Sequence, residues 1–210
     1  MSDVLIPNLK YAGLASDARL QLTAKNLTER GMKAHIVDRG EEARRVALEL
    51  IPDGAEVFTA TSRTLEEIGL REAIEESTRL RSVRSILVKM DMATQWHEMR
   101  VLRARPDVVV GSVHAITEQG EVVAASASGS QLGPYVSGAG KVIWVVGSQK
   151  LVPTLDEAMR RIEEYALPLE DARARLAYGQ GSFTGKVMTF FREYLEGRIN
   201  VILVKQKLGF

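Results

Sequence analysis

Two short apolar segments, residues 107–110 (DVVV) and 141–146 (KVIWVV), dominate the hydrophobic pattern of the chain. Each is a continuous valine-rich run bounded by Gly or Pro, which is typical of a strand covered on both faces. Between them the sequence predicts a hairpin, followed by a stretch of very small residues that let a backbone approach a ligand closely. In an open α/β sheet, ligands bind in the crevice past the carboxyl ends of the strands. We therefore expect the site in residues 106–150.

The remaining pattern alternates between helix and strand. Apolar residues at helical spacing predict helices over residues 17–30, 41–50, 61–68, 93–105, 155–165 and 168–178. Further strands are predicted over residues 32–37, 55–59 and 199–204. Residues 80–90 mix charges with a short apolar run, and the pattern there does not choose between a strand and irregular structure. This alternation favours an α/β fold with a mostly parallel sheet and helices on both faces. We expect one domain over residues 1–210, with residues 1–15 as an N-terminal arm.

Composition narrows the class of protein. The chain is 45% hydrophobic, which is enough for a core, and its 28 basic and 27 acidic residues give a net charge of +1. That balance offers no electrostatic footprint for nucleic acid. The absence of cysteine rules out disulfides, thiol nucleophiles and iron–sulfur ligation by this chain itself. The sequence lacks a signal-peptide pattern and an apolar segment of membrane-spanning length, so we expect a cytoplasmic protein. We predict no metal site, because His97-Glu98 lacks the second histidine of the HExxH pattern.

Ser62 and Thr64 follow the predicted strand 55–59 directly. Hydroxyls at a strand-to-helix turn, beside the free N–H groups of the first helical turn, make an anion-binding site. The simpler interpretation is that Thr64 caps the helix and that Glu67, three residues later, completes a capping box. On the sequence alone we favour the capping box, although one hydroxyl can cap while another binds.

A second group of candidates lies between the two apolar segments. Ser126, Ser128, Gly129 and Ser130 are concentrated where two predicted strands flank them, so we interpret them as anion-binding residues rather than as a flexible loop. Lys150 follows the second strand, where it can pair with an anionic substrate or lie in solvent.

His114 and Glu118 are the candidates for proton transfer, because histidine titrates near neutrality and burial raises the pKa of a carboxyl group towards it. An exposed Glu118 without a role is an equal alternative. GQGSFTGK at residues 179–186 fails the spacing of a phosphate-binding loop, and we interpret it as a Gly/Ser loop.

Four longer segments share a pattern with one known family. They read TATSRTLEEIGL at residues 59–70, DVVVGSVHAITEQGEVVAASASGSQ at 107–131, GKVIWVVGSQKLVPTLDEAMRRIEEYALPLE at 140–170 and ILVKQKLGF at 202–210. On these residues the chain resembles the LUD domain, a family named for lactate utilisation, over most of its length beyond about residue 20.

The resemblance implies a three-layer α/β/α fold similar to the group of ribose-5-phosphate isomerase, coenzyme A transferase and glucosamine-6-phosphate deaminase. In the isomerases of that group, a turn similar to Ser62 and Thr64 holds phosphate. Those enzymes carry acidic residues after the strand where this chain has 111–114 (GSVH), and a Lys-Gly-Gly type segment where it has 124–126 (AAS), so their catalytic residues do not transfer. Glu118-x-Gly120 does match the LUD pattern.

Three functional hypotheses follow. The first is a LUD protein of lactate or related organic-acid utilisation that binds an anionic small molecule in the crevice. The second is a non-catalytic subunit that binds iron–sulfur protein partners, because the sequence shows no complete catalytic constellation. The resemblance implies such partners, since the best-known members of the family are subunits of a lactate oxidation system whose partner proteins bear iron–sulfur clusters. The third is a sugar-phosphate isomerase. The sequence leaves open whether the chain is an enzyme, which cofactor it uses and whether it forms a homodimer.

Overall fold

The computed structural model describes residues 5–210 and contains two sheets. The main sheet has six strands in the order β1-β10-β7-β4-β2-β3, and every neighbouring pair is parallel. Its strands are β1 Lys33–Val37, β2 Glu56–Thr59, β3 Arg81–Ser82, β4 Val108–Gly111, β7 Lys141–Gly147 and β10 Ile199–Val204. The smaller sheet has the order β8-β5-β6-β9. Its strands are β5 Ala115–Thr117, β6 Val122–Ser126, β8 Leu151–Val152 and β9 Lys186–Phe190.

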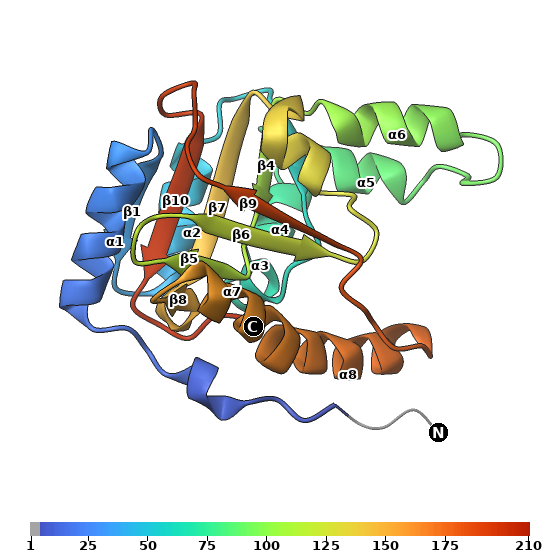
Figure 1. The fold of residues 1–210 in the computed structure, drawn as a ribbon. Coiled ribbons are helices and arrows are strands. Elements are labelled where there is room, and N and C mark those ends of the chain that lie inside the picture. The colour runs from blue at the N-terminus through green and yellow to red at the C-terminus, as the bar shows by residue number, and fades with distance from the viewer. Residues whose placement is uncertain (1–4) are drawn as a thin grey trace.

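Helices cover both faces of the main sheet (Figure 1). The α-helices are α1 Asp17–Glu29, α2 Gly40–Glu49, α3 Arg63–Glu67, α4 Leu70–Glu75, α5 Val83–Leu87, α6 Trp96–Ala104, α7 Leu155–Arg161 and α8 Leu167–Tyr178. Shorter helical turns are η1 Leu9–Ala12, η2 Pro134–Gly138, η3 Ser148–Lys150 and η4 Ile162–Ala166. The predicted α/β class with a mostly parallel sheet is confirmed.

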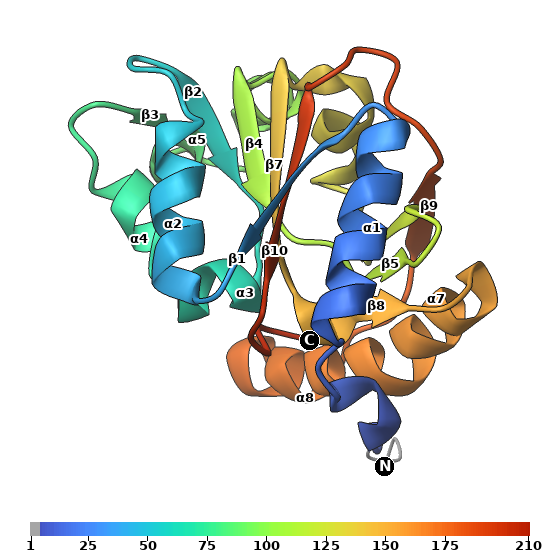
Figure 2. The same ribbon diagram turned by 90° about the vertical axis from the view of Figure 1, so that its left-hand side faces the viewer.

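Alternation along the central strands explains their continuous apolar sequence. Val108 and Val110 pack with Ile143 on the face covered by α2, α3 and α4. Val109 packs with Trp144 on the opposite face, towards α1 and the smaller sheet. Figure 2 shows the main sheet edge-on between these two groups. Each strand is buried on both sides, and burial of one such side chain stabilises the fold by about 1.5–3 kcal/mol.

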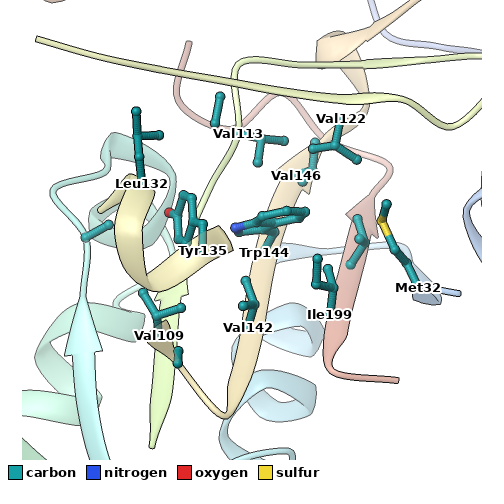
Figure 3. Packing of buried hydrophobic residues seen from close by; sticks show 14 of the residues in the cluster. Met32, Val109, Val113, Val122, Leu132, Tyr135, Val142, Trp144, Val146 and Ile199 are labelled. Atoms are coloured by element: carbon teal, nitrogen blue, oxygen red, sulfur yellow. The ribbon is translucent and has the colours of Figure 1, made fainter. Parts of the chain in front are cut away.

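The smaller sheet lies over Trp144, whose ring packs edge-on against Tyr135 at 5.3 Å and against Phe190 at 5.1 Å between centroids. Figure 3 shows Tyr135 and Trp144 side by side above the main sheet, with Val122 of β6 opposite them. The other face of the smaller sheet packs on α7 and η4 through Ala158, Ile162 and Tyr165.

Several local predictions need correction. Residues 80–90 contain the two-residue strand β3 and the helix α5. Helix α6 begins at Trp96 rather than at residue 93, because the carboxylate of Asp91 accepts from Ala93 N and forms a turn there. The described part of the arm, residues 5–15, is docked through Tyr11, which is buried, and residues 1–4 lie outside the described chain. The sequence did not predict the smaller sheet as a separate unit.

Candidate functional site

One cavity of about 280 Å³ lies where three neighbouring strands of the main sheet end. Three lining residues follow these strands directly. Ser62 comes after β2, Ser112 after β4 and Lys150 after β7. Strand β6 ends beside it and contributes Ser126 and the residues that follow. Because β2, β4 and β7 are parallel, their carboxyl ends meet at this edge of the sheet.

The cavity brings together most of the residues singled out in the sequence. Those that line it are Ser62, Thr64, His114, Ser126, Ser128, Ser130 and Lys150. Ser62 and Ser128, which come from separate parts of the chain, share this one space. Glu118 and Gly129 lie outside the lining residues of the cavity.

Lys150 is the buried cation of the site, with 2% of its surface exposed. Its Nζ donates to Thr64 Oγ1 at 3.1 Å and to Ser112 Oγ at 3.0 Å, both of them neutral partners. Within residues 5–210, no Asp or Glu forms an ion pair with it. Burial, helped by the nearby positive charge of Arg161 and opposed by Glu67, lowers the pKa of Lys150 to about 7.

Thr64 is a binding partner of Lys150 and not a helix cap. Its hydroxyl donates to the backbone carbonyl of Leu208 at 3.2 Å. The carboxylate of Glu67 accepts from Gly209 N at 2.7 Å instead of reaching back along the helix. The predicted capping box is therefore wrong. Ser62 occupies the N-cap position, and the side chains of Thr64 and Glu67 bond to the backbone of residues 208–209 instead of capping the helix.

Arg161 is a second buried cation that sequence reasoning missed. Its Nε donates to Gln149 O at 3.3 Å, its Nη1 donates to His114 O, and its guanidinium lies 5.1 Å from the centre of the Tyr165 ring. Burial lowers the pKa of Arg161 to about 10. A signal for it did exist, because Arg161 falls at helical spacing with the core residues Ala158 and Tyr165.

His114 is held as a neutral imidazole. Its Nδ1 accepts from the backbone N–H of Ala125 at 3.0 Å, so Nε2 carries the proton. Burial, and then the charges of Lys150 and Arg161, lower the pKa of His114 to about 3. This geometry makes Nε2–H a hydrogen-bond donor at neutral pH, rather than an acid that carries charge.

The serine loop after β6 is folded by its own hydrogen bonds. Ser126 Oγ accepts from Gly129 N at 2.9 Å and donates to Gln131 Oε1 at 3.0 Å. Gly129 has φ +85° and lies against the side chain of Lys186, so its part is to turn the loop and not to line the cavity. Ser128 and Ser130 are presented to the cavity by this turn.

Glu118 is separated from the other candidates. Its carboxylate lies 2.7 Å from Arg19 Nε on α1, and its backbone carbonyl accepts from Asn26 Nδ2 at 2.6 Å. Both contacts attach the β5–β6 turn to α1. The structure therefore places this residue as a tether between two elements.

Two further parts of the wall were not selected from the sequence. Ser112 follows β4 and contacts Lys150, although only its neighbour His114 was singled out. The Gly/Ser loop contributes Ser182, Phe183 and Thr184 after α8. The glycines of this loop indicated that its backbone can approach a ligand closely. Because the spacing did not match a phosphate-binding loop, the segment was not counted among the candidates.

Two features are absent from residues 5–210. These residues contain no group of three His, Asp or Glu side chains placed to hold a metal ion. None of the helices formed by these residues has the length and apolar character that a membrane crossing requires.

Comparisons with known proteins agree with this fold. The model of the LUD domain family matches residues 20–204. A crystal structure of a DUF162 family protein from Deinococcus radiodurans has a TM-score of 0.54 and 14% identity, over 91% of this chain and 99% of that one. No curated protein sequence matches the chain. The family is named for lactate utilisation, and the match supports a role of the chain related to it in general terms. Since the match extends over most of its length, the chain belongs to the LUD domain family.

Proposed function

We propose that the cavity binds a small anionic molecule that carries a carboxylate or phosphate group. One observation carries this proposal: Lys150 lines the cavity and Arg161 is buried behind it, bonded to the backbone carbonyls of Gln149 and His114, and within residues 5–210 neither cation has a carboxylate partner. A buried charge without a counter-ion is costly. A bound anion would supply the missing counter-charge.

The wall suits such a ligand because it offers many short hydroxyl groups. Ser62, Ser112, Ser128 and Ser130 line the cavity, and His114 presents its Nε2–H. Hydrogen bonds from neutral donors to an ionised group are roughly twice as strong as those between neutral groups. A volume of about 280 Å³ suits a small metabolite. Lactate and related short organic acids are therefore the first ligands to test.

The contacts of Thr64 bear on the choice between a short carboxylate and a sugar phosphate. Its hydroxyl hydrogen is already donated to Leu208 O, and its oxygen accepts from Lys150. Thr64 is thus occupied, which favours a compact organic acid over a phosphate held by this turn. The sugar-phosphate isomerase is the alternative that the experiment below tests.

Thermal shift and calorimetry test the proposal with a panel of L-lactate, D-lactate, pyruvate, inorganic phosphate and ribose 5-phosphate, with glycerol as the neutral control. We expect at least one anion to raise the melting temperature and glycerol to leave it unchanged. Lys150→Met should weaken binding at least about tenfold. Lys141→Met is the matched control, because Lys141 Nζ donates to Leu50 O and belongs to no part of the cavity wall.

Failure of every anion in the panel to bind would overturn the proposal. Conversion of ribose 5-phosphate to a ketose would instead identify an isomerase. A cluster-bearing protein that co-purifies with a chain unable to bind any of these anions would favour the non-catalytic subunit.

A further inference from the structure

Lys150 Nζ has a position left open for a ligand. The hydroxyl hydrogen of Thr64 is donated to Leu208 O, so Thr64 Oγ1 must act as the acceptor for one N–H of Lys150. Ser112 Oγ, at 3.0 Å, takes a second direction around the nitrogen. A tetrahedral nitrogen bonded to Cε has a third direction, for which residues 5–210 supply no hydrogen-bond partner. Lys150 lines the cavity, and a ligand there can meet that third direction.

The surroundings favour the neutral amine, which is the nucleophilic form of lysine. The charged and titratable groups that act on Lys150 are Arg161 of α7 and Glu67 of α3, and His114 beside β5 is neutral. Burial is the largest effect, and the pKa of Lys150 of about 7 leaves a substantial fraction deprotonated at neutral pH. Lysines that are desolvated next to another cation are the ones that form imines with carbonyl substrates.

We propose that Lys150 is a nucleophile that forms a reversible imine with the carbonyl carbon of a small 2-oxo acid bound in the cavity. This inference rests on the proposed function, because the carboxylate of the oxo acid is the anion held there. The ligand class follows from combining an amine nucleophile with a wall that suits an anion, since a 2-oxo acid carries both a carbonyl and a carboxylate within a few atoms.

The step balances within the protein and the ligand. The lone pair of the neutral Nζ attacks the carbonyl carbon, the nitrogen gives one of its two protons to the carbonyl oxygen, and a carbinolamine forms. The carbon–oxygen bond then breaks, the nitrogen loses its remaining proton to the leaving hydroxyl, and water departs. Ser112 Oγ lies 3.0 Å from Nζ and is placed to relay that proton. No electrons are gained or lost.

Borohydride trapping tests the inference directly. The full chain is incubated with pyruvate and sodium borohydride, and its intact mass is measured. An imine reduced in place adds the mass of the oxo acid less one oxygen atom, and peptide mapping should find it on Lys150 and not on the other lysines. Acetate and L-lactate, which lack a carbonyl group, should give no adduct. Acetone, which lacks a carboxylate, should give at least about tenfold less.

Two variants separate the amine from the charge. Lys150→Arg keeps a cation at the position but cannot form the imine, so it should lose the adduct while keeping a measurable thermal shift with pyruvate. Lys141→Arg should trap as the wild type does. At pyruvate concentrations far below saturation, the rate of trapping follows the protonation of the free protein, so it should rise through a pH of about 7, well below the ordinary lysine value of 10.5.

The outcomes distinguish this inference from the proposed function. Pyruvate that binds without an adduct, or an adduct spread over surface lysines, would overturn the imine and leave anion binding in place. A chain that neither binds any anion of the panel nor traps pyruvate would overturn both.

Discussion

Arg161 Nη1 donates a hydrogen bond to the backbone carbonyl of His114, so a buried guanidinium on α7 holds the segment that carries the imidazole. The same guanidinium donates to Gln149 O, one residue before Lys150. Arg161 therefore holds the backbone at two lining residues, His114 and Lys150, without lining the cavity itself. One side chain thus contributes both to the stability of the fold and to the geometry of the site.

Arg161→Met should destabilise the protein by about 1–3 kcal/mol, because it leaves the His114 and Gln149 carbonyls without their donor. Urea unfolding measures this change in the free energy of unfolding. Arg160→Met is the matched control on the preceding residue, since the Arg160 side chain is 61% exposed, and it should change stability by less than about 0.5 kcal/mol. Equal effects of the two substitutions would contradict this assignment.

Lys150 makes stability depend on pH. Its pKa is about 7 in the folded chain against an ordinary value of 10.5, so the unfolded chain holds more protons between these values. Stability should therefore rise as the pH increases from about 7 towards 10.5, and Lys150→Met should abolish that rise. Unfolding measured across this range in both proteins checks the slope. The lowered pKa of His114, about 3 against 6.5, predicts a separate rise between those two values.

Anion binding should be accompanied by proton uptake. A bound carboxylate favours the charged ammonium of Lys150 and raises its pKa, so the complex takes up protons when the pH lies above about 7. Calorimetry in buffers of different ionisation enthalpy measures the number of protons. Binding with no proton uptake in the wild type, or uptake retained in Lys150→Arg, would assign the anion to another site.

Gly129→Ala should distort the serine loop. Gly129 has φ +85°, and an added Cβ would lie 2.7 Å from Lys186 Cδ. We expect a loss of about 1–2 kcal/mol of stability and weaker anion binding, because Ser128 and Ser130 flank this turn. Gly133→Ala is the control, since no atom outside its chain neighbours lies within 4 Å of the added Cβ. A Gly129→Ala protein that binds as the wild type does would show that the turn does not position these serines.

Glu118→Gln should leave anion binding and trapping unchanged. The carboxylate pairs with Arg19 on α1 at 2.7 Å, away from the cavity, so the substitution should cost at most about 1 kcal/mol of stability. Thermal unfolding and the pyruvate adduct measure the two effects. Loss of the adduct with unchanged stability would return Glu118 to the site.

Periodicity predicted the parts of this protein that rest on local pattern. The runs 107–110 and 141–146 became β4 and β7, and the helices over 17–30 and 41–50 became α1 and α2 within a residue or two. The hydroxyl-rich segments reached one cavity because parallel strands end at a common edge. Local pattern could not predict Arg161 or the true partners of Thr64. Those partners lie 144 and 86 positions away in the sequence, at Leu208 and Lys150.

The position of β10 has a consequence for synthesis of the chain. Residues 199–204 insert between β1 and β7, which are made long before them. Until that segment leaves the ribosome, both earlier strands present unpaired edges, and the carbonyl of Leu208 is not yet there to orient Thr64. The nascent chain therefore has neither a complete main sheet nor a complete cavity wall until these last residues have been made, so the site is assembled only at the end of synthesis.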